Sequence, residues 1–147
     1  MFTARSFTAR DRILDFEPGP LVDRDALDSL SPWEREHLAE VDIGLWRVLP
    51  EPRCYLNHAC EPNAVSTDSV VTALRDIAAG EEITIDYRLN AYDDGAGAWV
   101  MACECDPGHP HQVVGEFFSL PAATQERYLE WAPPFIREMY VARHRLK

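Results

Sequence analysis

The sequence is poor in positive charge, and lysine occurs only once, as Lys147. Its 14 Lys and Arg residues stand against 25 Asp and Glu residues, which gives a formal net charge of −11 at pH 7. Direct binding to nucleic acid depends on basic side chains that neutralise phosphates. We therefore expect no direct nucleic-acid partner. Residues 54–106 hold ten acidic and two basic side chains. This acidic excess can attract a basic peptide, and it is equally well explained as a contribution to solubility.

Long apolar runs are also missing. No run approaches the roughly 20 residues that a membrane span needs, and the first residues do not resemble a signal peptide. We therefore expect no membrane association and a cytoplasmic location. The length of 147 residues is enough for one hydrophobic core, and nothing in the sequence indicates an oligomeric state.

Cysteine is scarce, with four residues in the chain. Two of them form the segment Cys103-Glu104-Cys105. In a cytoplasmic protein, such spacing is more typical of metal ligands or free thiols than of a disulfide.

Three short stretches concentrate the chemically active groups. Residues 55–63 contain two amides, an imidazole, a thiol and a proline, in the order Asn57-His58-Ala59-Cys60-Glu61-Pro62-Asn63. Residues 80–87 read Gly-Glu-Glu-Ile-Thr-Ile-Asp-Tyr, and the Cys-x-Cys segment at residues 103–105 follows. Together, in this order, they resemble the SET-domain methyltransferases. The family signature has serine where this chain has Ala59, and the resemblance runs from Phe2 to about Phe117, weakly over residues 21–50.

The resemblance implies a β-rich α+β fold in which small curved β-sheets surround a C-terminal pseudoknot, with few short helices. It implies a SET domain over residues 1–100, a post-SET-like Cys/His segment over 101–118 and a C-terminal helical tail over 119–147. The function implied is S-adenosylmethionine-dependent methyl transfer to a lysine side-chain amine, on a basic protein or peptide.

Three residues match positions that act on the cofactor and substrate in that family. Tyr87 matches the catalytic tyrosine beside the transferred methyl, and Asn57 and His58 match the pair that binds S-adenosylmethionine. Each also has a structural interpretation. A tyrosine can cap the edge of a core, and a buried polar pair can tie a loop crossing together.

A structural zinc ion is also implied. Cys60, Cys103 and Cys105 match three of the four cysteines that bind zinc in post-SET families. The fourth position is Pro110, and either flanking imidazole, His109 or His111, can complete a tetrahedral site. The alternative is three reduced thiols held by packing alone.

One departure favours a different function. The family opens with Gly-x-Gly near the cofactor. Counting back from Phe7 places Thr3 and Arg5 there, whereas counting back from Phe2 places both glycine positions before the first residue, and no glycine precedes Gly19 in either case. A catalytically weak or inactive scaffold that binds zinc and a protein partner is therefore a second hypothesis. A methyltransferase for a non-protein amine is a third.

Local patterns predict the secondary structure around these motifs. We expect a hairpin over residues 2–16, strands over 70–75 and 82–87, and helices over 119–131 and 135–143. Ser31-Pro32-Trp33-Glu34 predicts a capped helix that ends near Glu40. Tyr87 would then end a strand on its apolar face.

Overall fold

The computed structural model describes residues 1–67, 69–95, 97–106 and 108–145. Lys147 therefore lies outside the described residues, as does the end of the predicted helical tail. The chain forms two compact units. The first comprises Met1–Pro18, Pro50–Tyr87 and Met101–Val113, and the second comprises Gly19–Leu49, Arg88–Val100 and Val114–Lys147. The predicted division at residues 100 and 118 stays a prediction.

The described elements are mostly short strands with a few short helices, in agreement with the expected fold class. The strands are β1 (Arg12–Asp15), β2 (Leu21–Asp23), β3 (Leu38–Asp42), β4 (Leu45–Val48), β5 (Asn57–His58), β6 (Ala64–Ser66), β7 (Val70–Ala73), β8 (Thr84–Ile85), β9 (Val100–Cys103) and β10 (His111–Val114). The α-helices are α1 (Pro32–Glu36), α2 (Ala122–Tyr128) and α3 (Pro134–Arg145). The 3-10 turns are η1 (Leu27–Ser29), η2 (Arg53–Tyr55), η3 (Tyr87–Asn90) and η4 (Phe117–Ser119).

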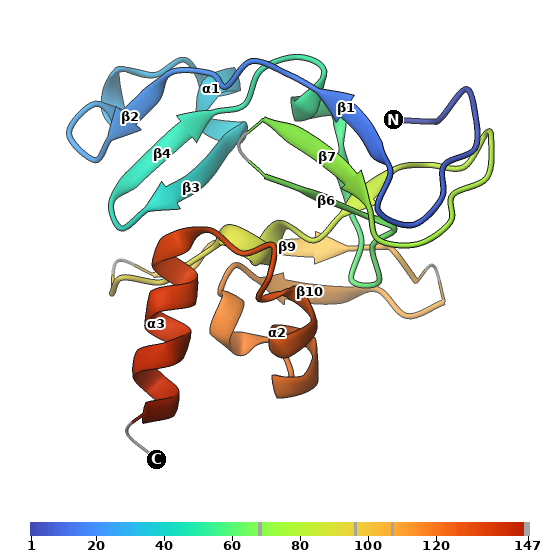
Figure 1. Cartoon of the computed structure of the whole chain (residues 1–147). Coiled ribbons are helices and arrows are strands. Elements are labelled where there is room, and N and C mark those ends of the chain that lie inside the picture. The colour runs from blue at the N-terminus through green and yellow to red at the C-terminus, as the bar shows by residue number, and fades with distance from the viewer. Residues whose placement is uncertain (68, 96, 107, 146–147) are drawn as a thin grey trace. The chain divides into compact units, whose positions relative to one another are not determined.

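The first unit is built on the antiparallel sheet β1-β7-β6, visible as neighbouring arrows in Figure 1. The β-branched residues of β7 favour a strand, as the sequence predicted, although it ends at Ala73 and not at residue 75. The core of this unit is formed by Leu56, Ala64, Val71, Ile83 and Ile85, and Tyr87 packs against it. The first two chemically active stretches, residues 55–63 and 80–87, therefore contribute to or contact a buried apolar cluster.

A second, two-stranded sheet brings the first two motifs together. Strands β5 and β8 run parallel, and Asn57 pairs with Thr84 while His58 pairs with Ile85. The Ala59 N–H donates to the Ile85 carbonyl at 2.9 Å. Residues far apart in sequence are thus aligned in register, and the place where residues 57–63 lie beside residues 81–87 is called the crossing below.

The predicted strand over residues 82–87 is wrong in its extent. Only Thr84–Ile85 is a strand, and Tyr87 begins η3. The Tyr87 N–H donates to His58 Nδ1 at 3.2 Å. Because that N–H is held by a side chain, it is not available to a neighbouring strand, and the ladder ends.

The predicted N-terminal hairpin is also wrong. Phe2 forms a bridge with Glu82 and Phe7 with Ile77, while β1 pairs with β7. The Phe7 and Ile77 backbones exchange two hydrogen bonds of 2.9 Å. These partners lie 55 to 80 positions away in the sequence, from Asp15 with Val70 to Phe2 with Glu82, so a local pattern gave no indication of them.

The second unit contains the antiparallel sheet β2-β4-β3 and the helices. Ser31 and Glu34 form the predicted capping box of α1, but the helix ends at Glu36 and not near Glu40. Residues 38–42 instead form β3 against β4, because pairing with a neighbouring strand outweighs the weak helix preference of a short segment. Within the part of the chain that the structure describes, no helix has the length and apolar character to span a membrane.

Candidate functional site

The two asparagines of the first motif each contact a glutamate of the second. Asn57 is exposed, and its Nδ2 donates to Glu82 Oε1 at 2.7 Å. Asn63 is 2% exposed, and its Nδ2 donates to Glu81 Oε1 at 3.0 Å and to the Glu82 carbonyl at 2.7 Å. Its Oδ1 accepts the Thr84 N–H at 2.9 Å. Asn63 thus fixes the crossing of the two stretches, whereas Asn57 presents its amide at the surface.

Glu81 is held as an anion. Arg75 Nη2 lies 2.6 Å from Glu81 Oε1. This contact, followed by the hydrogen bonds from Asn63 and the Ala78 N–H, lowers the pKa of Glu81 to about 2. Neither glutamate was singled out by the sequence, because adjacent acids in a turn are common and their partners lie 18 to 25 positions away.

The His58 side chain is enclosed, with 2% of its surface exposed. Its Nδ1 accepts the Tyr87 N–H and lies 3.6 Å from Asp86 Oδ1, while its Nε2 lies 3.4 Å from Cys60 Sγ. An amide N–H can only donate, so Nδ1 carries a lone pair and, in the neutral ring, Nε2 carries the proton. The imidazole therefore donates toward the thiol.

The Tyr87 hydroxyl faces inward. It donates to the Leu56 carbonyl at 2.6 Å, and its ring centroid lies 5.3 Å from that of His58. Burial raises the pKa of Tyr87, and the nearby positive charge of Arg53 opposes this increase. The phenol is thus uncharged at neutral pH, and its proton is directed to a carbonyl.

Arg53 is a part of this site that the sequence did not identify. It is 7% exposed, and its Nε donates to Ser66 Oγ. Burial lowers the pKa of Arg53 to about 10. Its carbonyl accepts the Leu56 N–H at 3.2 Å, so the side chain anchors η2 to β6 directly before the carbonyl that Tyr87 contacts. A lone arginine beside a cysteine carries no sequence signal for this role.

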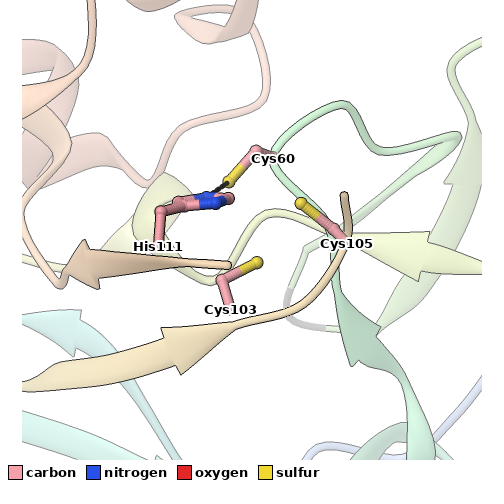
Figure 2. A group of neighbouring side chains, drawn as sticks. All are labelled: Cys60, Cys103, Cys105 and His111. Carbon is pink, nitrogen blue, oxygen red and sulfur yellow. Dashed lines mark hydrogen bonds between the residues drawn. The ribbon is translucent and has the colours of Figure 1, made fainter. Parts of the chain in front are cut away.

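Four side chains form a separate cluster in the same unit: Cys60, Cys103, Cys105 and His111. Figure 2 shows their sulfur atoms and the imidazole directed toward one another, from the loop after β5, the end of β9 and the start of β10. Their ligand atoms all lie within 4.8 Å of one another. Burial raises the pKa of the Cys103 thiol, and a hydrogen bond from the Cys60 backbone lowers that of Cys105.

The two candidate histidines have different surroundings. His111 Nε2 lies 3.2 Å from Cys60 Sγ, and its Nδ1 lies 3.1 Å from the His109 carbonyl. A carbonyl only accepts, so Nδ1 carries the proton and the Nε2 lone pair faces the sulfurs. The His109 ring instead lies 3.1 Å from Asp106 Oδ2. The structure brings His111, and not the His109 ring, to the thiols.

This donor set fits a zinc ion. Zinc binds three thiolates and one imidazole in tetrahedral sites, with Zn–S of about 2.3 Å and Zn–N of about 2.0 Å. Such bonds place ligand atoms about 3.5 to 3.8 Å apart, and the separations here need only small adjustments to reach those values. The carbonyl behind His111 is the kind of outer contact that orients a metal-binding imidazole.

Thr3 and Arg5 are the residues that the count from Phe7 places at the family's glycine positions. Thr3 is 7% exposed, and its backbone pairs with the turn of the second motif through Glu81 and Gly80, at 3.0 and 2.9 Å. Arg5 is exposed, with its guanidinium 4.7 Å above the Phe7 ring. This segment therefore packs onto the second motif without glycine.

Comparison with known proteins gives three results. A family model described as "SET domain" matches residues 1–88. The curated "Putative histone-lysine N-methyltransferase 1" of Plasmodium falciparum (isolate 3D7) is 46% identical over 50 residues, which is 28% of this chain and 1% of that protein's length. The crystal structure of a P. falciparum protein, described as a putative histone methyltransferase, resembles the structure of this chain with a TM-score of 0.44 and 20% sequence identity. The match covers 58% of this chain and 84% of the other chain.

Proposed function

The chain belongs to the SET-domain family, and from that membership we propose that it is an S-adenosylmethionine-dependent methyltransferase for lysine side-chain amines. The observation that supports this most is the position of Tyr87, whose inward hydroxyl meets the backbone directly before Asn57. The chain spans 1% of the curated relative's length, so the activity proposed here is that of this chain's own site.

Tyr87 is the proposed catalytic residue. Because its proton is donated to the Leu56 carbonyl, the oxygen lone pairs remain to accept a hydrogen bond from an incoming amine. Deprotonation of a free lysine ammonium group at pH 7 costs about 4.6 kcal/mol. An apolar surrounding such as the Leu56 cluster lowers that cost, because it disfavours the charged ammonium. Holding and orienting the neutral amine is then the role of the phenol.

Asn57 and the backbone of β5 are the groups proposed to contact the methyl donor. The exposed Asn57 amide can meet a polar ligand, whereas the enclosed His58 ring cannot. A contact from His58 would therefore come from its backbone. S-adenosylmethionine supplies the electrophilic methyl group when bound.

Cys60, Cys103, Cys105 and His111 are the proposed ligands of a structural zinc ion, which would join the Cys-x-Cys segment to the first motif. His109 supports the site through its carbonyl. The net charge of −11 favours a basic protein or peptide as substrate. The cytoplasmic location stays a prediction.

A second candidate function is a zinc-binding interaction module without turnover. The bulky Thr3 and Arg5 at the family's glycine positions favour it, because side chains there restrict the space beside the donor. Methylation of a small non-protein amine is a variant of the first proposal that differs only in substrate.

Calorimetry of zinc-replete protein with S-adenosylmethionine separates these functions. We expect saturable binding with one site per chain, and transfer of a radiolabelled methyl group to a lysine-rich protein mixture. Binding without any labelled product would support the interaction module. No detectable binding would refute the methyltransferase proposal. Labelling of small amines alone would show that the substrate is a non-protein amine and not a protein lysine.

A further inference from the structure

The His58 imidazole contacts both parts of the site. Its Nε2 is 3.4 Å from Cys60 Sγ, and its Nδ1 accepts the Tyr87 N–H at 3.2 Å. Cys60 belongs to the thiol cluster, and Tyr87 carries the inward phenol. One ring therefore lies between the proposed metal centre and the proposed catalytic tyrosine.

We propose that His58 is a positioning residue that couples occupancy of the metal centre to the position of Tyr87. This inference rests on the metal centre proposed above. His58 donates from Nε2 to the Cys60 sulfur and receives the Tyr87 backbone at Nδ1. Movement of the sulfur toward a bound ion then turns or shifts the ring, and the ring carries the Tyr87 backbone with it.

The direction of both bonds follows from the groups that face the ring. The Tyr87 amide can only donate, so Nδ1 is the acceptor and Nε2 the donor. A thiolate accepts such an N–H, and an N–H directed at a ligand sulfur is the kind of outer contact that tunes metal affinity by 10- to 100-fold. His58 thus has the proton in the position that supports Cys60 as a ligand.

The surroundings leave the ring little freedom. The side chains of His58 and Asp86 are each 2% exposed, and the backbone of β5 is held to β8 by parallel pairing. The Tyr87 ring packs beside the imidazole, with an interplanar angle of 53°. Because the packed surroundings restrict independent movement of the imidazole, we expect a displacement at Nε2 to be transmitted to Nδ1.

Three substitutions separate the two bonds. His58→Asn keeps an oxygen near the Nδ1 position but does not reach Cys60. His58→Gln places an amide near the Nε2 position but loses the acceptor for Tyr87. His58→Ala removes both contacts and serves as the reference, and Asn57→Ala, on the same strand, is the matched control.

Zinc affinity, from competition with a chromophoric chelator, is the first measurement. We expect His58→Asn and His58→Ala to bind 10- to 100-fold more weakly than the wild type, and His58→Gln and Asn57→Ala to stay within about threefold. Co²⁺ added in place of Zn²⁺ should give the absorption of a tetrahedral thiolate site in all folded variants.

The Tyr87 amide resonance in ¹⁵N-labelled protein is the second measurement. In the wild type it should shift when Zn²⁺ is added, and in His58→Asn that response should disappear while the hydrogen-bonded position of the resonance is retained. Wild-type zinc affinity in His58→Asn, or an unchanged Tyr87 response in that variant, would overturn the inference alone. The inference would also be overturned if the Tyr87 amide resonance of the wild type did not shift when Zn²⁺ is added. Absence of zinc binding by the wild type would overturn both the proposed metal centre and this inference.

Discussion

The Tyr87 hydroxyl lies 2.6 Å from the carbonyl oxygen of Leu56, 31 positions earlier in the chain. Leu56 is 1% exposed and directly precedes Asn57. The end of the second motif is thus bonded to the start of the first. The same contact orients the phenol and ties the crossing together, so its two roles have to be separated by experiment.

Substitution Tyr87→Phe should keep the fold and lose most methyl transfer. Removing the hydroxyl deletes one hydrogen bond, which costs about 1 kcal/mol of stability, whereas removing the group that orients the amine should slow the reaction by ~100-fold or more. Initial rates and thermal unfolding measure both effects. Tyr55→Phe is the matched control, because Tyr55 is exposed and its hydroxyl contacts Glu51. Equal rates in the two variants would remove the catalytic assignment of Tyr87.

Substitution His111→Ala should abolish tight zinc binding, and His109→Ala should preserve it. The Nε2 lone pair of His111 faces Cys60 Sγ, whereas the His109 ring faces Asp106 and only its carbonyl supports the site. Alanine at residue 109 keeps that carbonyl. Metal content after dialysis against a weak chelator should approach one zinc per chain for His109→Ala and fall to near zero for His111→Ala. The reverse result would exchange the two roles.

Substitution Asn63→Ala should destabilise the protein far more than Asn57→Ala. Asn63 is 2% exposed and makes three hydrogen bonds to residues 81–84, so its loss leaves buried groups without partners and should cost about 2 to 4 kcal/mol. Asn57 is exposed, and its loss should cost less than about 1 kcal/mol. Urea denaturation compares them. Similar midpoints would mean that Asn63 does not hold the crossing.

Substitution Glu40→Gln should flatten the dependence of stability on pH. In the second unit, the pKa of Glu40 is raised to about 7, chiefly by burial; the Tyr92 N–H opposes this increase, Asp94 and Glu116 add to it, and Arg24 opposes it. The folded state therefore holds this proton more tightly than the unfolded state. The contribution of Glu40 to stability is fully present below about pH 4.5 and is lost as the pH rises through 7.

The glutamine variant keeps an acceptor for the Tyr92 N–H without a buried charge. Above pH 7 it should be more stable than the wild type by roughly 1 kcal/mol, with little difference at pH 5. The low pKa of Glu81 acts only between about pH 2 and 4.5, so it does not disturb this comparison. Parallel stability curves from pH 5 to 8 would contradict the assignment to Glu40.

Local rules predicted the features that depend on neighbouring residues. The capping box of Ser31 and Glu34 and the β-branched strand at residues 70–73 are confirmed. The family motifs also identified the chain's membership and fold correctly. The errors arose where a distant partner decides the structure, as for Phe7 with Ile77 and for the end of the strand before Tyr87.

The finer geometry of the site could not be read from spacing. His109 and His111 are equivalent by sequence, since both flank Pro110, and only the direction of each ring distinguishes them. The buried position of Arg53 has no sequence signal either, because its hydrogen-bond partner Ser66 lies 13 positions later. The pairing of Asn57 with Glu82 likewise depends on the register of β5 and β8.

Cys60 and His111 are separated by 51 positions. During translation at about 5 to 20 residues per second, the imidazole follows the thiol into solution by roughly 3 to 10 s. During that time the Cys60 thiol has no assembled cluster around it and is accessible to oxidants and to other metal ions that bind thiolates. A nascent chain arrested before residue 103 would carry one of the four proposed ligands, and a thiol-reactive reagent should label Cys60 in it but not in the finished, zinc-bound protein; labelling of the free Cys54, which lies outside the cluster, is measured separately in both.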